Sequence, residues 1–235
     1  MIFALSLLGG CLDLEELFAG VTSDHFAEAT VLGLSAPAGM ELTGTRYEDG
    51  ARAGVYLASI SGEPIDAVLG LRSPSNGDIA LEPQGDGSWI TPRLIYTVGE
   101  TYSVLRDGAE VLQAPAVGPP TFAVPATHAS GTGITIDLGD QGFERALVTI
   151  LDLETGEEVW DNVPDDISAA MLEMNEEDPL NVDVPADVFA EPGAYAIGVA
   201  GLTPSTPADV QDLNTLVSIM ATGVMVLQPI QVTGQ

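Results

Sequence analysis

The side chain with the clearest chemical setting in this sequence is that of Cys11. It is the only cysteine among the 235 residues, so the chain cannot form an internal disulfide. A short apolar run, Ile2 to Leu8, and the pair Gly9-Gly10 precede it, and Asp13 follows it closely. A brief apolar core followed by small residues is typical of a cleaved export signal, because small side chains let a peptidase approach the backbone. The thiol of Cys11 is also the one group in this stretch that a lipid could alkylate.

The motif Leu8-Gly9-Gly10-Cys11 resembles the lipobox of bacterial lipoproteins, in which an aliphatic residue and two small residues precede a cysteine. The resemblance implies a signal peptide at residues 1–10, cleavage after Gly10, and acyl chains on the sulfur and amine of Cys11. Each buried CH₂ contributes ~0.8 kcal/mol, and stable anchoring takes more than one chain. Leu12 stands where aspartate often signals inner-membrane retention, so the resemblance favours the outer membrane or the cell surface.

A second interpretation of this stretch stays open. Met1 is followed directly by Ile2, whereas such signals begin with Lys or Arg, and the apolar run is short. Residues 1–11 can instead be a buried strand or the start of a helix with Cys11 in the core, because free cysteine is often buried. A membrane-spanning helix is not expected, since ~20 apolar residues are needed and acidic residues interrupt the run sooner.

No other residues form a recognisable catalytic motif. His25 and His128 are the only histidines, and two residues so far apart in sequence do not provide the closely spaced ligands of a zinc site. A Gly-x-Ser-x-Gly nucleophile elbow is absent, and His128 lies in a turn-like stretch that predicts a surface loop. The sequence therefore predicts neither an enzymatic activity nor a resident cofactor, apart from the calcium discussed next.

Acidic side chains gather in the second half of the chain, between residues 161 and 178. Calcium binds about six to eight oxygens from carboxylates, carbonyls and water, so this region is a candidate calcium site, although its spacing is not that of an EF-hand. A solvated acidic loop is the alternative, and a carboxylate pair for glycoside hydrolysis could be chosen from the set only arbitrarily. The candidate calcium ligands are Asp165, Asp166, Glu173, Glu176, Glu177 and Asp178.

The charge balance restricts the partners. The chain has 35 acidic residues against 6 basic ones, a formal net charge of −29. A field this negative repels nucleic acids and anionic lipid headgroups, so nucleic-acid binding is disfavoured. Hydrophobic residues make up 46% of the chain, which is enough to form buried cores. The partners that remain are a membrane, through an N-terminal lipid, and an envelope protein or glycan.

From Glu28 onward, short runs alternate apolar and polar residues, with Asn-Gly and Asp-Gly turns between them. This pattern is typical of a β-sandwich or barrel. Before it, residues 12–27 have apolar side chains at roughly helical spacing. The strands expected in the first half are 29–34, 54–60, 67–72, 78–81, 88–91, 101–106 and 110–113. Those expected in the second half are 121–125, 133–138, 146–153, 157–161, 169–173, 180–184, 194–200 and 216–227.

Tyr102 and Tyr195 each begin an alternating strand just after a glycine turn, late in the first and second halves. This resembles the tyrosine corner of immunoglobulin-like and fibronectin type III-like sandwiches, where the phenol bonds back to the backbone at a sheet corner. Trp160, on the return strand of a predicted hairpin, is expected to anchor a core or an interface. The resemblance implies two tandem antiparallel β-sandwich domains.

The proline-rich stretch 114–120 divides the chain, because proline stiffens linkers and blocks strand pairing. We therefore expect an all-β chain with a first sandwich at residues 29–117 and a second at 118–235. Residues 11–28 carry the lipidated cysteine and form a tether or a short helix. The function that fits is a non-enzymatic structural or binding module of the cell envelope. The alternatives are an exported enzyme or accessory subunit acting on carbohydrate, and a calcium-dependent adhesion module.

Overall fold

The computed structural model describes residues 23–42, 50–59, 61–91, 93–162, 180–205, 213–214 and 218–234. Regular structure in these ranges consists of β-strands and one 3-10 turn, η1 (Ala186–Phe189). The predicted all-β fold is confirmed. Among the described residues there is no helix with the length and apolar character that a membrane span requires.

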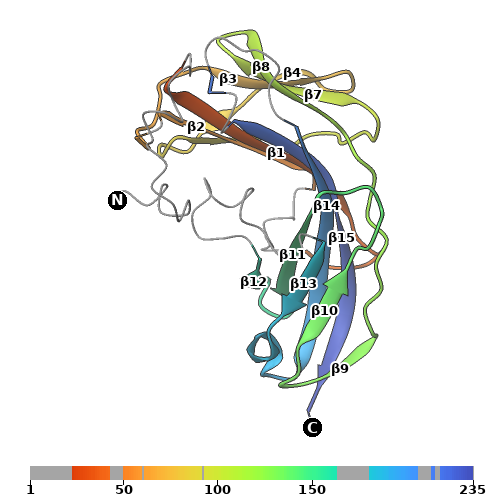
Figure 1. Ribbon diagram of the computed structural model, residues 1–235. Coiled ribbons are helices and arrows are strands. Elements are labelled where there is room, and N and C mark those ends of the chain that lie inside the picture. The colour runs from red at the N-terminus through yellow and green to blue at the C-terminus, as the bar shows by residue number, and fades with distance from the viewer. Residues whose placement is uncertain are drawn as a thin grey trace.

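The largest sheet has nine strands and draws them from both halves of the chain. Its order is β12-β11-β14-β15-β1-β2-β6-β5, with β9 beside the C-terminal end of β15. Figure 1 shows that this sheet curves from one end of a bent molecule to the other. Its strands are β1 (His25–Ser35), β2 (Arg52–Ser59), β5 (Glu82–Pro83), β6 (Ser88–Ile90), β9 (Thr127–Ala129), β11 (Arg145–Asp152), β12 (Glu158–Asp161), β14 (Gly193–Ser205) and β15 (Ile219–Thr233).

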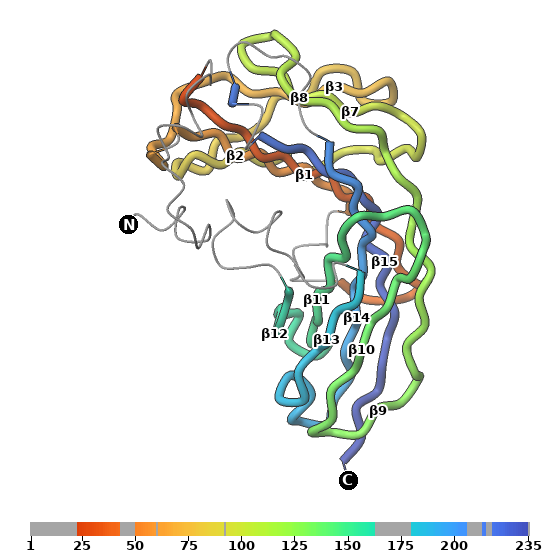
Figure 2. Tube along the Cα trace, viewed as in Figure 1, coloured from red at the N-terminus to blue at the C-terminus, as the bar shows by residue number. Residues whose placement is uncertain are grey.

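Two smaller sheets cover the two ends of the large one. A four-stranded sheet of order β4-β3-β7-β8 packs over β1 and β2, and the pair β10-β13 packs over β11, β14 and β15. Each end is therefore a sandwich with its own apolar core (Figure 2). The strands of the smaller sheets are β3 (Leu69–Ser73), β4 (Gly77–Ala80), β7 (Thr101–Arg106), β8 (Ala109–Pro115), β10 (Ile134–Asp137) and β13 (Asn181–Val184).

Strand β15 belongs to both sandwiches. Its side chains alternate between the two faces of the sheet, as in any strand. Met220 packs in the first core, and Ile230 and Val232 pack in the second. On the opposite face, Met225 and Leu227 join a third apolar cluster with residues of β11 and β14. Burial on both faces explains why β15 has an almost continuous apolar sequence rather than a strict alternation.

The hairpins agree closely with the sequence pattern. β7 and β8 pair over Asp107 and Gly108, which both have positive φ, 52° and 85°. Positive φ at both central residues is the geometry of a type I′ turn, for which Asp-Gly is a preferred pair. The predicted pairing of 146–153 with 157–161 is likewise present as β11 and β12.

One predicted strand is wrong. Residues 121–125 run past the second core without strand pairing, although Phe122 and Val124 pack against that core. Side-chain amides contact this backbone instead: Gln141 both accepts from the N–H of Thr121 and donates to its carbonyl, and Gln228 donates to Phe122 O. A glutamine amide supplies the donor and acceptor that a neighbouring strand would otherwise provide.

The remaining differences concern strand ends and undescribed residues. β1 begins at His25, so residues 25–27 are extended, although a tether or short helix was expected to reach this far. β14 and β15 extend beyond the predicted 194–200 and 216–227, and the short strands β5 and β9 were not predicted. The predicted strand 169–173 lies outside the described residues. The domain boundary at residues 117 and 118 stays a prediction.

Candidate functional site

The most distinctive arrangement among the described residues is the place where the large sheet bends between the two sandwiches. Three glycines from three neighbouring strands meet there: Gly201 of β14, Gly223 of β15 and Gly33 of β1. In the parallel pairing of β1 with β15, Leu32 lies opposite Gly223 and Gly33 lies opposite Val224. Gly201 lies between the Val199–Val226 and Thr203–Thr222 pairs of β14 and β15.

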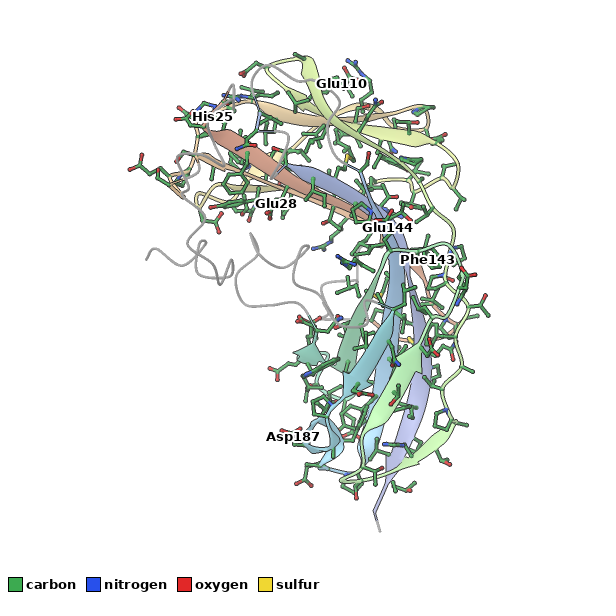
Figure 3. The ribbon with its side chains drawn as sticks, in the orientation of Figure 1. His25, Glu28, Glu110, Phe143, Glu144 and Asp187 are labelled. Atoms are coloured by element: carbon green, nitrogen blue, oxygen red, sulfur yellow. The ribbon has the colours of Figure 1, made fainter. Side chains whose placement is uncertain are left out.

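Aromatic rings cover two of these glycines on the face that carries the sandwich cores. A Cβ at Gly33 would lie 2.7 Å from the Tyr96 ring, and a Cβ at Gly201 would lie 2.4 Å from the Phe143 ring. Phe143 comes from the segment before β11 and lies at the junction of the two halves (Figure 3). We call Gly33, Gly201, Gly223, Tyr96 and Phe143 the elbow. Glycine is required at positions 33 and 201 because a side chain there would occupy the volume of the ring, and at position 223 because a Cβ would crowd Leu202 and the carbonyl of Gly201.

Hydrogen bonds connect the elbow to the segment that joins the two halves. Thr222 of β15 is fully buried, and its hydroxyl donates to Pro115 O at 2.6 Å. Tyr96 donates from its hydroxyl to Val117 O at 3.0 Å and stacks on Tyr102 with ring centroids 5.5 Å apart. The predicted linker is therefore held against β15 at the bend.

Both corner tyrosines bond to the backbone. Tyr102 is fully buried; its hydroxyl donates to Ile95 O at 2.7 Å and accepts from the N–H of Thr97 at 2.9 Å. The Tyr195 hydroxyl donates to Glu191 O at 3.1 Å. Such bonds to nearby backbone define a tyrosine corner. Trp160 is half-buried at the edge of the second core.

The two histidines lie far apart in the fold and are engaged locally. His25 begins β1, where Nδ1 lies 3.3 Å from an Arg106 guanidinium nitrogen and Nε2 lies 3.3 Å from Asp24. His128 is in β9, not in a loop as predicted; its Nε2 lies 2.8 Å from Thr132 O, and its ring meets Phe189 edge-on. The structure does not bring the two histidines together.

The sequence-predicted lipid and calcium residues lie outside the described ranges. This applies to Gly10 and Cys11, and to the candidate calcium ligands Asp165, Asp166, Glu173, Glu176, Glu177 and Asp178. In the ranges that are described, no three His, Cys, Asp or Glu side chains gather as metal ligands would. Asn162, beside the candidate region, bonds to the backbone of β11: its carbonyl accepts from Val148 N–H and its amide donates to Ala146 O.

The sequence pattern did not predict the elbow or the burial of Glu28. Glu28 of β1 is only 6% exposed and lies opposite Tyr56 of β2. An acid inside the apolar run of β1 was a visible signal for it. The elbow had a weaker signal, three separate glycines inside strand patterns, which often mark a close backbone approach.

No protein-family model matches this sequence, and no curated protein matches it. Solved structures align with the chain at low similarity, and three of them illustrate this. The Yersinia pseudotuberculosis adhesin InvE aligns with 87% of this chain at 10% identity and a TM-score of 0.26, and this chain spans 59% of its length. Domains 3–5 of the extracellular part of Drosophila OTK align with 78% of this chain and 70% of their own at 7% identity and a TM-score of 0.21.

The third structure is a mouse coronavirus receptor-binding domain complexed with its murine receptor. One chain of this complex aligns with 86% of this chain and 98% of its own length, at 11% identity and a TM-score of 0.20. TM-scores this low carry no argument about function.

Burial of three tyrosines gives the stability of the protein a pH dependence. Desolvation raises the pKa of Tyr96 to about 12, and it also raises the pKa values of Tyr102 and Tyr195. In the unfolded chain tyrosine ionises near its ordinary pKa of about 10. Above that pH the unfolded state loses protons that the folded state keeps, so the free energy of unfolding falls as pH rises from about 10 to 12.

Denaturant unfolding at a series of alkaline pH values measures this decline. The tyrosines' contribution to stability should be fully present below about pH 10, and Tyr96→Phe should make the decline between pH 10 and 12 shallower. An equally steep decline in the Tyr96→Phe protein would contradict the assignment to Tyr96. Tyr56→Phe is the matched control, since Tyr56 lies on β2, away from the elbow.

Proposed function

We propose that this protein is a non-enzymatic module of the cell envelope, exported and held at the membrane by acyl chains on Cys11. The two sandwiches act as one structural or binding body in front of that anchor. The observation that carries the proposal is the sharing of β15, which pairs with β1 in the first sandwich and with β14 in the second. A shared strand fixes the angle between the two ends, as a structural or presenting element requires.

The use of buried polar groups supports this function. Ser218 accepts from Ala27 N–H, Thr91 accepts from Ala53 N–H, and Thr222 donates to Pro115 O. Each of these side chains connects two segments that are distant in sequence. Hydrogen-bonded polar groups in a core rigidify it and specify a single arrangement. Ser218, Thr91 and Thr222 therefore hold neighbouring strands together.

The acidic surface determines what the module would bind. With a net charge of −29, long-range attraction favours a partner that is cationic or bridged by cations, and screening by salt weakens it. The partner we propose is an envelope protein or glycan, contacted through loops at the ends of the sandwiches, where binding residues are commonly placed on a rigid scaffold. By resemblance, the location is the outer membrane or the cell surface.

The anchor is tested with full-length protein produced in a bacterial host and extracted from membranes. The N-terminal peptide should begin at Cys11 and carry the added mass of a diacylglyceryl group and an acyl chain. The protein should partition into detergent, because two or more acyl chains give stable membrane binding. Cys11→Ala should remove both the added mass and the partitioning.

A second variant tests the predicted cleavage after Gly10. Gly10→Leu keeps the thiol but places a bulky side chain before the cleavage site, so residues 1–10 should be retained. Far-UV circular dichroism of both variants should match that of the wild type. An unmodified thiol on Cys11 in the membrane-extracted wild type would refute the proposed anchor.

A further inference from the structure

The first and last described strands are direct neighbours and run in the same direction. β1 pairs in parallel with β15 over eight aligned residues, from Glu28 opposite Ile219 to Ser35 opposite Val226. The other described strands lie between these two in sequence. Figure 1 shows the two strands side by side in the upper sandwich, running towards the bend.

The direction of the backbone groups along β1 follows from its neighbours. In β2, Leu57 and Ser59 direct their N–H groups away from β1, to Gly87 O and Glu63 O. The intervening residues of β2, such as Gly54 and Tyr56, therefore face β1, because backbone groups alternate sides along a strand. They pair with Thr30 and Glu28.

The alternate residues of β1 consequently face β15. The N–H of Ala27 donates to Ser218, just before β15, which agrees with this assignment. By the same alternation, the N–H groups of Ala29 and Val31 face β15, whereas that of Thr30 faces β2. One edge of β1 therefore forms backbone hydrogen bonds with β15, and the other edge forms them with β2.

This arrangement decides how a pulling force is distributed. A force that draws the start of β1 away from the end of β15 tends to slide the two strands past each other. The hydrogen bonds of a parallel pair are evenly spaced along the strands, so all of them share the load. In an antiparallel hairpin pulled at its open end, the bonds break one after another.

We propose that the parallel pair β1–β15 is a mechanical clamp that carries tension between the N-terminal and C-terminal sides of the chain. The role of the clamp in the cell rests on the proposed function, because a membrane anchor at Cys11 would pull on the start of β1 while a partner bound at the far end of the second sandwich, where β15 ends, pulls the other way. The clamp itself depends only on the topology. β1 and β15 thus connect the two sides of the chain directly, through one pairing.

Three further contacts resist sliding of β15. β14 pairs with it along most of its length, β9 pairs with its last residues, and the Thr222 hydroxyl holds Pro115. Side chains of β15 are buried in all three apolar clusters, including Met220 and Met225, which are fully buried. Movement by one residue would transfer each of these side chains to the opposite face of the sheet.

Single-molecule force spectroscopy tests the clamp with full-length protein in a Cys11→Ala background. In the first variant, Asp24→Cys with Gly234→Cys, the pulling force is applied through the two new thiols, so that β1 and β15 slide past each other. The pair Asp24→Cys and Ser61→Cys peels β1 from β2, because His25 and Ser59 lie opposite each other at one end of that hairpin. All three positions are exposed. Rupture should need a severalfold higher force in the first geometry, and equal or lower force would overturn the proposal.

Two backbone substitutions provide a matched control. An ester in place of the peptide N–H of Val31 removes a donor that faces β15, and one at Thr30 removes a donor that faces β2. Each leaves the side chain unchanged. The Val31 ester should lower the rupture force in the sliding geometry, and the Thr30 ester should lower it in the peeling geometry. Equal effects of both esters in the sliding geometry would overturn the clamp.

Force resistance and equilibrium stability are separate quantities, since forced unfolding is governed by the unfolding rate. Chemical denaturation of both ester proteins therefore accompanies the force measurements, and comparable losses of stability are expected. The two proposals also fail separately. A strong clamp in a protein whose Cys11 is never lipidated would refute the anchor alone, whereas a lipidated protein that ruptures easily would refute the clamp alone.

Discussion

Replacing Tyr102 with phenylalanine should lower the free energy of unfolding by about 2 kcal/mol, because it removes two hydrogen bonds and leaves the N–H of Thr97 without its partner. Ile95 O keeps its bond from the Asn76 amide. The Tyr102 side chain is fully buried. Its hydroxyl donates to Ile95 O and accepts from Thr97 N–H, so it holds the segment before β7 from both sides. Phenylalanine keeps the stacking with Tyr96, and the loss therefore reports the hydroxyl alone.

Tyr195→Phe is the matched control in the second sandwich. Its hydroxyl makes one bond, to Glu191 O at 3.1 Å, so about 1 kcal/mol of stability should be lost. Denaturant unfolding measures both variants, and the midpoint should shift while the slope stays constant. A smaller loss for Tyr102→Phe than for Tyr195→Phe would contradict the two-bond account. The Tyr102 variant should also lower the midpoint of thermal unfolding more than the Tyr195 variant.

The hairpins and the strand pattern could be predicted because they are local. The Asp107-Gly108 turn requires positive φ at both residues, and the sequence places suitable residues there. Strand 101–106 was predicted with the bounds that β7 has. In each of these segments the strands are joined by a short turn, so turn chemistry and alternation are enough to define them.

The pairing of β1 with β15 could not be predicted in the same way. Its partners, such as Glu28 and Ile219, are almost the whole chain apart, and no turn connects them. The apolar run of β15 showed that the strand is buried, but not which strands lie beside it. The expectation of two consecutive sandwiches came from a proline-rich segment, and it did not include a strand common to both.

Segment 121–125 was predicted as a strand, but its backbone does not pair with one. Alternation correctly placed Phe122 and Val124 against the second core, but alternation describes which side chains are buried and not what the backbone binds. Gln141 and Gln228 come from other parts of the chain and contact this backbone through their amides. A side-chain partner of this kind leaves no trace in the local pattern.

Replacing Gly223 with alanine should lower the free energy of unfolding by about 1–3 kcal/mol, the usual cost of overpacking a filled core. A Cβ at Gly223 would lie 2.7 Å from a Leu202 methyl and 2.8 Å from Gly201 O. The leucine can rotate, but the carbonyl belongs to β14. Relief therefore requires β14 and β15 to move apart at the bend, where the strand pairing is already interrupted between Val199–Val226 and Thr203–Thr222.

Gly54→Ala distinguishes this crowding from the general effect of adding a methyl group to a strand. Gly54 lies in β2 beside β1, and a Cβ there would have nothing within 4 Å. Its replacement should be neutral or slightly stabilising, because alanine restricts the unfolded chain more than glycine does. Denaturant midpoints at constant slope measure both variants. If Gly223→Ala proved as harmless as Gly54→Ala, the two strands would have room to separate, and the bend would not be fixed by their close approach.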